Sequence, residues 1–224
     1  MTTQLPHFPG LYKHRTSAER DLFTAAMQSF GLDPVNVAAC IEFETGGTWS
    51  VNSRNATTNA TGLIGFMPST AKSLGTTVDA LAAMTFEQQL GYVVRYFQSV
   101  GIVKLKRPVD YYAAVFWPAA IGTDDSYVIA RDPSPVYAAN KGLDRHGNGQ
   151  ITTADLRETI EGTIARARGT IPKNVKGGQN MNKPGQALNS NIDAAVIVGT
   201  LSLVVVAGIF VAVVRSKKRL TFSV

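Results

Sequence analysis

The 224-residue sequence has one cysteine and three histidines. A single thiol, Cys40, cannot form an intramolecular disulfide. Three scattered histidines without a cysteine cluster do not make a metal site, and no cofactor is expected. Cys40 lies between Ala39 and Ile41, and these apolar neighbours predict a buried core thiol rather than a reactive one.

Acidic residues are missing from a long polar segment. Glu44 is followed by 34 residues without Asp or Glu, and the next acid is Asp79. Most glycosidases need two carboxyl groups, one as acid and one as nucleophile or base. The segment after Glu44 supplies no second one, and Glu42 lies about 200° away around the same predicted helix. The pattern therefore favours a mechanism that uses Glu44 alone.

An apolar signal segment is absent from residues 1–30, so these residues do not predict export. A long uncharged apolar run lies instead at residues 194–214. At about 1.5 Å per residue, a helix of this length crosses a bilayer core. The basic cluster at 215–219 follows directly and is expected on the cytoplasmic side, with the N-terminal domain outside. The alternative, a buried helix of a soluble domain, fits the abrupt basic end less well.

The net charge of +6 and the pI near 9.5 favour an anionic partner, such as a cell-wall polymer, a membrane surface or nucleic acid. Charge alone does not choose among them. Some of the basic residues lie in the segments that flank the apolar run, so part of the excess need not describe a binding face.

Helix-start signals recur along the chain and predict a mainly α domain. Three Thr-x-x-Glu/Gln/Asp patterns indicate helix caps, and an Asp-Pro pair indicates a further start. These signals are Thr16 with Glu19, Thr85 with Gln88, Thr152 with Asp155, and Asp33 with Pro34.

Five segments follow from these patterns. Residues 1–15 are expected to be an N-terminal arm, 16–171 the mainly α domain, 172–193 a flexible linker, 194–214 a single transmembrane helix and 215–224 a basic tail. A linker of about 20 residues has a typical span of roughly 25 Å. The domain can therefore work at a distance from the membrane that holds it.

Glu44 stands at the end of a predicted apolar helix, before two glycines and a polar loop. In a single-acid mechanism it protonates the leaving sugar oxygen and then, as a carboxylate, removes a proton from a hydroxyl of the substrate. Such a group needs a raised pKa, which burial among Ile41, Phe43, Phe66 and Met67 would supply. The alternative is an ordinary exposed glutamate at a helix end.

The wider pattern resembles a known family. Glu44-Thr45-Gly46 is followed by Ser53 and then by Gly62-Leu63-Ile64-Gly65-Phe66-Met67-Pro68 with Thr70-Ala71. This order resembles the lytic transglycosylases of the lysozyme superfamily, whose pattern is Glu-Ser-Gly, a serine nine positions after the Glu, and Gly-Leu-Met-Gln-x-Met-Pro-x-Thr-Ala. Phage and prophage members are the most similar, through runs like those at 112–120 and 142–152. The resemblance covers about residues 20–165.

The resemblance implies a lysozyme-like fold and cleavage of the bond between N-acetylmuramic acid and N-acetylglucosamine, leaving a 1,6-anhydro sugar. Glu44 would be acid and then base, Ser53 would assist near the reacting sugar, and Tyr112 would position Glu44 and the substrate. Gly65 departs from the family pattern because it stands where a Gln is usual. Substrate contacts are expected from Thr45, Trp49, Gly62, Ile64, Phe66 and Met67.

One of these contacts has an alternative. Trp49 would stack on a sugar ring, or it packs on its own loop.

Residues 144–155 resemble an EF-hand calcium loop, with Asp144, Asn148 and Asp155 as weak candidate ligands. His146 at the third position does not suit calcium, so the loop is expected to be a structured turn that caps the next helix, and no metal is assigned.

The expected function is that of a membrane-anchored peptidoglycan lytic transglycosylase of viral origin, which penetrates the cell wall locally during genome delivery. Its expected partners are peptidoglycan glycan strands, a lipid bilayer through residues 194–214, and other virion membrane or capsid proteins, with no nucleic acid. It would be a single-pass protein of the virion membrane or host envelope, with the domain toward the wall. The alternatives are a hydrolytic lysozyme for host lysis and a non-catalytic wall-binding module.

Overall fold

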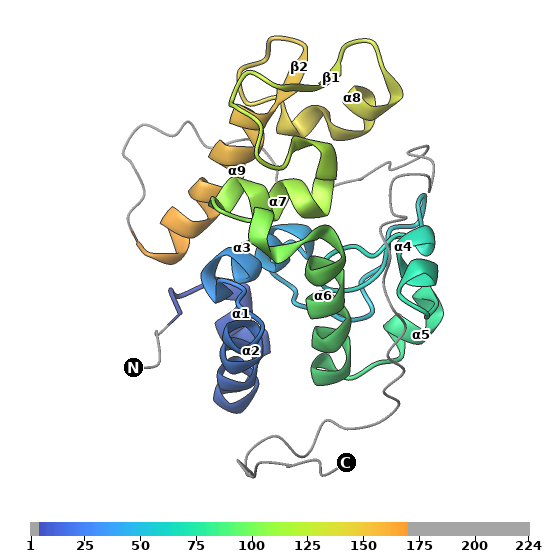
Figure 1. Cartoon of the computed structure of the whole chain (residues 1–224), viewed down its shortest axis with the longest axis vertical. Helices are drawn as coiled ribbons and strands as arrows, with labels where there is room; N and C mark the ends of the chain where they lie inside the picture. The colour runs from blue at the N-terminus through green and yellow to red at the C-terminus, as the bar shows by residue number, and fades with distance from the viewer. Residues whose placement is uncertain (1–4, 170–224) are drawn as a thin grey trace, which may run out of the picture. The chain divides into compact units, whose positions relative to one another are not determined.

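The computed structural model describes residues 5–169, which are mainly helical with little strand, as the helix-start signals predicted (Figure 1). Within this range no helix is long and apolar enough to cross a membrane. The predicted linker, transmembrane helix and basic tail lie outside the described residues.

The helices and strands follow one another in a simple order. The α-helices are α1 (Pro9–His14), α2 (Ser17–Ser29), α3 (Pro34–Glu44), α4 (Pro68–Ser73), α5 (Val78–Ala82), α6 (Phe86–Val100), α7 (Pro108–Phe116), α8 (Pro135–Asn140) and α9 (Thr153–Ala167). The 3-10 helices are η1 (Ile102–Lys104), η2 (Pro118–Ala120) and η3 (Lys141–Leu143). The strands β1 (Val128–Arg131) and β2 (Gln150–Thr152) pair antiparallel.

The predicted helix caps are confirmed. Thr16, Thr85 and Thr152 each form a reciprocal capping box at the start of α2, α6 and α9. Asp33 caps α3, because its carboxylate accepts hydrogen bonds from two main-chain amides of the first turn. Each cap satisfies amides that have no partner within the helix, so these boundaries depend on a few neighbouring residues.

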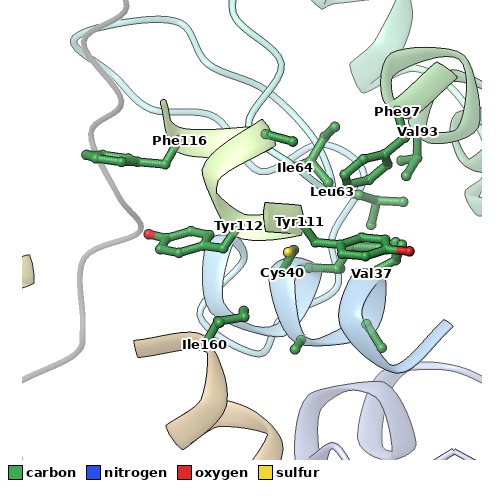
Figure 2. Close-up of a cluster of buried hydrophobic side chains, with 14 of the residues drawn as sticks. Val37, Cys40, Leu63, Ile64, Val93, Phe97, Tyr111, Tyr112, Phe116 and Ile160 are labelled. Carbon is green, nitrogen blue, oxygen red and sulfur yellow. The ribbon is translucent and has the colours of Figure 1, made fainter. Parts of the chain in front are cut away.

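The centre of the core is α3, which packs against both α7 and α9 (Figure 1). Eight of its 11 residues are buried, which suits a helix that is mainly apolar. Residues 37–41 are fully buried, and Cys40 among them confirms the predicted core thiol. Figure 2 shows Tyr111 and Tyr112 of α7 pointing in opposite directions above α3, with the Cys40 sulfur between them in this view.

The N-terminal residues contribute more to the core than an arm laid over a surface would. Residues 5–15 contain α1, and both Phe8 and Leu11 are fully buried. Glu42 of α3 accepts hydrogen bonds from the main-chain N–H groups of Gly10 and Leu11, at 2.9 and 3.3 Å. The carboxylate thus fastens α1 to α3.

Candidate active site around Glu44

Glu44 is the last residue of α3, and its side chain is only 7% exposed. No hydrogen bond reaches its carboxyl group from residues 5–169. Burial alone raises its pKa from 4.5 to about 8, because an ionised carboxylate loses its hydration there. The alternative of an ordinary exposed glutamate at a helix end is wrong, and the raised pKa is the property that the single-acid mechanism requires.

Three weakly acidic side chains surround this carboxyl group. Cys40 lies one turn earlier on α3, Tyr96 comes from α6 and Tyr112 from α7. Burial in the first place, and the Glu44 charge in the second, raise the pKa of each well above its ordinary value. All three are therefore neutral when Glu44 titrates, and none supplies a compensating positive charge.

Tyr112 has a specific place in this group. Its ring is fully buried, meets Phe43 edge to face at 5.2 Å between centroids and stacks on Phe116 at 6.0 Å. Its hydroxyl has no hydrogen-bond partner among residues 5–169, whereas the Tyr96 hydroxyl donates to the carbonyl of Ala114. A buried hydroxyl without a partner is uncommon, since leaving it unpaired costs about 1–3 kcal/mol. The structure thus brings Tyr112 and Glu44 together, and the positioning role of Tyr112 stays a prediction.

Gly65 also faces Glu44. Its φ of +64° lies in the left-handed region, and a Cβ built at this position would be 3.5 Å from Glu44 Oε2. The position at which the sequence departs from the pattern that it resembles therefore lies directly beside the candidate catalytic acid.

The loop that carries Gly65 is held by Gln89 of α6, which is fully buried. Its Oε1 accepts a hydrogen bond from Leu63 N at 2.8 Å, and its Nε2 donates to Val51 O at 2.9 Å and Leu81 O at 2.8 Å. A Cβ at Gly62 would be 2.5 Å from Gln89 Oε1, so only glycine fits against this amide. Sequence reasoning missed Gln89, although an amide on the apolar face of a helix was a signal.

Further main-chain pairing shapes the same loop. Isolated antiparallel bridges join Arg54 to Thr61 and Thr61 to Phe66. The Ser53 carbonyl accepts from Gly62 N at 2.8 Å, while the Ser53 hydroxyl makes no hydrogen bond with residues 5–169. Ser53 is partly exposed, and its assistance near a reacting sugar stays a prediction.

Two predicted substrate contacts, Trp49 and Thr45, are buried in the free protein. Trp49 is fully buried, meets Phe23 edge to face at 5.7 Å and donates its indole N–H to Glu42 Oε2 at 2.5 Å. No face of its ring is open to a sugar. Thr45 is 3% exposed, and its hydroxyl donates to Ile41 O and accepts from Trp49 N. Both residues stabilise the turn after α3.

Glu42 faces away from Glu44, as its position on the helix predicted. Its two carboxylate oxygens accept hydrogen bonds from the Trp49 indole and from the main chain of Gly10 and Leu11. These bonds commit the Glu42 carboxylate to joining α1 and the Trp49 loop to α3.

The remaining predicted contacts divide into two groups. Ile64 and Phe66 are buried in the core, and the main-chain N–H groups of Gly62 and Phe66 already donate within the loop. Gly62, Ile64 and Phe66 are therefore part of the packing of the loop, and their contact with a substrate stays a prediction. Met67 is partly exposed, and its contact with the substrate stays a prediction.

The candidate calcium loop uses its oxygens internally. Asp144 accepts hydrogen bonds from the main-chain amides of Gly147 and Gly149, at 2.7 and 2.9 Å, and from the Tyr137 hydroxyl at 2.8 Å. The Asn148 side-chain oxygen accepts from Gln150 N at 3.0 Å. The loop is thus closed by its own amides.

Asp155 is likewise committed, because it accepts from Arg145 N and from both the amide and the hydroxyl of Thr152. In the part of the chain that the structure describes, no group of three or more His, Cys, Asp or Glu side chains could hold a metal ion. The capping box of Thr152 with Asp155 confirms the turn that caps α9.

The charge of the domain differs from that of the chain. Residues 5–169 contain 15 Lys and Arg and 15 Asp and Glu, so their formal net charge is zero. The whole positive excess of +6 lies outside residues 5–169, whereas the sequence pattern predicted only part of it in the segments that flank the apolar run. The basic pI therefore says nothing about a binding face of the domain.

Comparison of the chain with protein-family models, curated proteins and solved structures found no match. Function is therefore inferred from the surroundings of Glu44 and from the sequence pattern that contains it.

Proposed function

We propose that the chain is a peptidoglycan lytic transglycosylase with a lysozyme-like fold, in which Glu44 is the only catalytic carboxyl group. The observation that supports this most is the state of Glu44, which is buried, accepts no hydrogen bond from residues 5–169 and has a pKa raised to about 8. Such a group is protonated at neutral pH and can donate its proton to the leaving sugar oxygen.

The absence of a nearby second carboxylate within residues 5–169 favours transglycosylation over hydrolysis. Paired glycosidase carboxyls lie roughly 5–10 Å apart and influence one another's titration. The pKa of Glu44 is raised by burial only, with no contribution from another charge. Glu42 is bonded to the Trp49 indole, and Asp79 pairs with Arg54 at 2.7 Å. Neither is available as a nucleophile beside Glu44.

The proposed reaction has two proton transfers. Glu44 donates its proton to the glycosidic oxygen as the bond from that oxygen to the anomeric carbon of the muramic acid breaks. The resulting carboxylate then removes the proton of the C6 hydroxyl of the same sugar, whose oxygen closes onto the anomeric carbon. The proton returns to Glu44, no water is consumed, and a 1,6-anhydro ring is formed. Tyr112 and Ser53 are proposed to position the sugar and the acid.

The products test this proposal. The full chain, kept soluble in a mild non-ionic detergent, is incubated with purified peptidoglycan, and the released muropeptides are identified by mass spectrometry. Anhydro ends are expected. Reducing ends, which are heavier by one water molecule, would show a hydrolytic lysozyme instead, and wall binding without products would show a non-catalytic module.

A matched pair of variants tests the role of Glu44. Glu44→Gln is expected to abolish product formation, because an amide has no proton of suitable acidity. Glu87→Gln makes the same change at an exposed position in the first turn of α6 and is expected to have no effect. Activity retained in Glu44→Gln would show that the acid has been assigned wrongly.

Location is a separate proposal. Residues 194–214 would anchor the enzyme in a virion membrane or host envelope, with the linker at 172–193 allowing the domain to reach the wall during genome delivery. Added protease should cleave the domain from intact particles if it faces outward. Protection of the domain until the membrane is dissolved would contradict this orientation.

A further inference from the structure

Gly65 is the departure from the family pattern that lies beside the acid. It is partly exposed, and its left-handed backbone is part of the tight turn in which its N–H donates to Gly62 O at 3.2 Å. The Cβ that it lacks would meet Glu44 Oε2 at 3.5 Å and the Ala60 methyl at 4.0 Å, with no closer neighbour. There is thus room for a side chain at this position, and that side chain would face the carboxyl group.

We propose that the missing side chain at Gly65 leaves Glu44 Oε2 without a hydrogen-bond donor from residues 5–169, so that a substrate sugar oxygen takes that place. The claim that a sugar oxygen takes this place, called the substrate half, rests on the proposed function. The claim that Gly65 affects Glu44 in the free protein, called the protein half, can be measured without any turnover.

The surroundings of Glu44 explain why one side chain at position 65 would matter. The groups that face the carboxyl are Cys40 from α3, Tyr96 from α6 and Tyr112 from α7, and all three are neutral over the range in which Glu44 titrates. No positive charge contributes to the pKa of Glu44. A single amide donor to Oε2 would therefore be the strongest stabilisation of the carboxylate that the site has.

Both proton transfers benefit from an unbonded Oε2. A donor at position 65 would lower the pKa of Glu44, so less of the acid would be protonated at neutral pH. The carboxylate left after the first step would also be a weaker base toward the sugar hydroxyl, since proton affinity governs both steps. Glycine thus favours catalysis because it has no side chain that could donate a hydrogen bond to Oε2.

Two variants separate a hydrogen-bond effect from a backbone effect. Gly65→Asn brings an amide two bonds beyond Cβ, within reach of Oε2, and asparagine tolerates a positive φ. Gly65→Ala adds a methyl group at an ordinary contact distance, with no donor. The alanine variant therefore reports the strain of a Cβ at this φ.

The first measurement is the titration of Glu44 itself. In the full chain labelled with ¹³C at glutamate carboxyls, the signal lost in Glu44→Gln identifies Glu44. Its midpoint is expected near pH 8 in the wild type, unchanged in Gly65→Ala and lower by about one pH unit in Gly65→Asn. A wild-type midpoint near the ordinary value of 4.5, or equal midpoints in all three proteins, would overturn the inference.

The second measurement is the pH profile of kcat on purified peptidoglycan. The alkaline limb is expected to move to lower pH in Gly65→Asn and to keep its position in Gly65→Ala, whatever the loss of rate from strain. Equal limbs would overturn the substrate half. Should the wild type form no anhydro products while the midpoints still shift, the proposed function fails and the effect of Gly65 on Glu44 stands.

Discussion

Replacing the buried Glu44 with glutamine should give a stability, relative to the wild type, that rises as pH increases. The native state keeps Glu44 protonated up to about pH 8, whereas the unfolded chain releases that proton near pH 4.5. Between these values the native state binds more protons than the unfolded state, so the contribution of Glu44 to stability falls as pH rises. The contribution is fully present below pH 4.5 and is lost by the time pH exceeds 8. Glutamine does not titrate and has no such loss.

The size of the effect follows from the shift in pKa. Each unit corresponds to about 1.4 kcal/mol, so the wild type loses roughly 3 kcal/mol by pH 7 and about 5 kcal/mol by pH 9 through this one group. Any constant difference from burying an amide cancels when the two proteins are compared across pH. The free energy of unfolding of Glu44→Gln minus that of the wild type should therefore rise by these amounts.

Urea unfolding of the full chain in detergent at several pH values measures this difference. Glu87→Gln, at an exposed site, is the control and should give a difference that is flat with pH. If the curves of Glu44→Gln and the wild type run parallel within about 0.5 kcal/mol from pH 4 to pH 9, the burial of an uncompensated carboxyl is refuted.

Three further predictions concern the supports of the site. Gln89→Met should lower the free energy of unfolding by about 3 kcal/mol, because buried main-chain groups of the loop and of α5 lose their hydrogen-bond partner. Calorimetry should show no such loss for Gln98→Met, at an exposed position of the same helix. Trp49→Phe should lower stability by about 2 kcal/mol through the lost bond to Glu42 and leave KM for peptidoglycan unchanged, whereas a raised KM with intact stability would restore the sugar-stacking role. Added Ca²⁺ or a chelator should leave Tm unchanged, and a rise in Tm that depends on Asp144 would show that calcium opens the loop and binds there.

Local features of this protein could be predicted from sequence because they depend on neighbouring residues. The caps at Thr16, Thr85 and Thr152 each involve a residue and its neighbour three positions later, so the pattern contains the whole interaction. The burial of Cys40 followed from the apolar character of its helix. The isolation of Glu44 from other acids was visible as a stretch of 34 residues without one.

The burial of Trp49 could not be predicted from sequence, because distant segments decide its exposure. Trp49 stands in a polar loop, and its ring packs against Phe23 of α2 and Phe86 of α6. Thr45 differs, because its hydroxyl donates to Ile41 O only four residues earlier in the chain. Residues of polar loops are usually exposed, but tertiary packing buries Trp49.

The sequence by itself determined the helices, the core thiol and a lone acid at the end of an apolar helix, since each is encoded within a few residues. Tertiary structure decided the chemistry around that acid. The raised pKa of Glu44 comes from burial among α3, α6 and α7, and the position of Gly65 beside Oε2 comes from a loop held by Gln89. Desolvation depends on all the groups that surround a carboxyl in space, so it cannot be deduced from the spacing of residues along the chain.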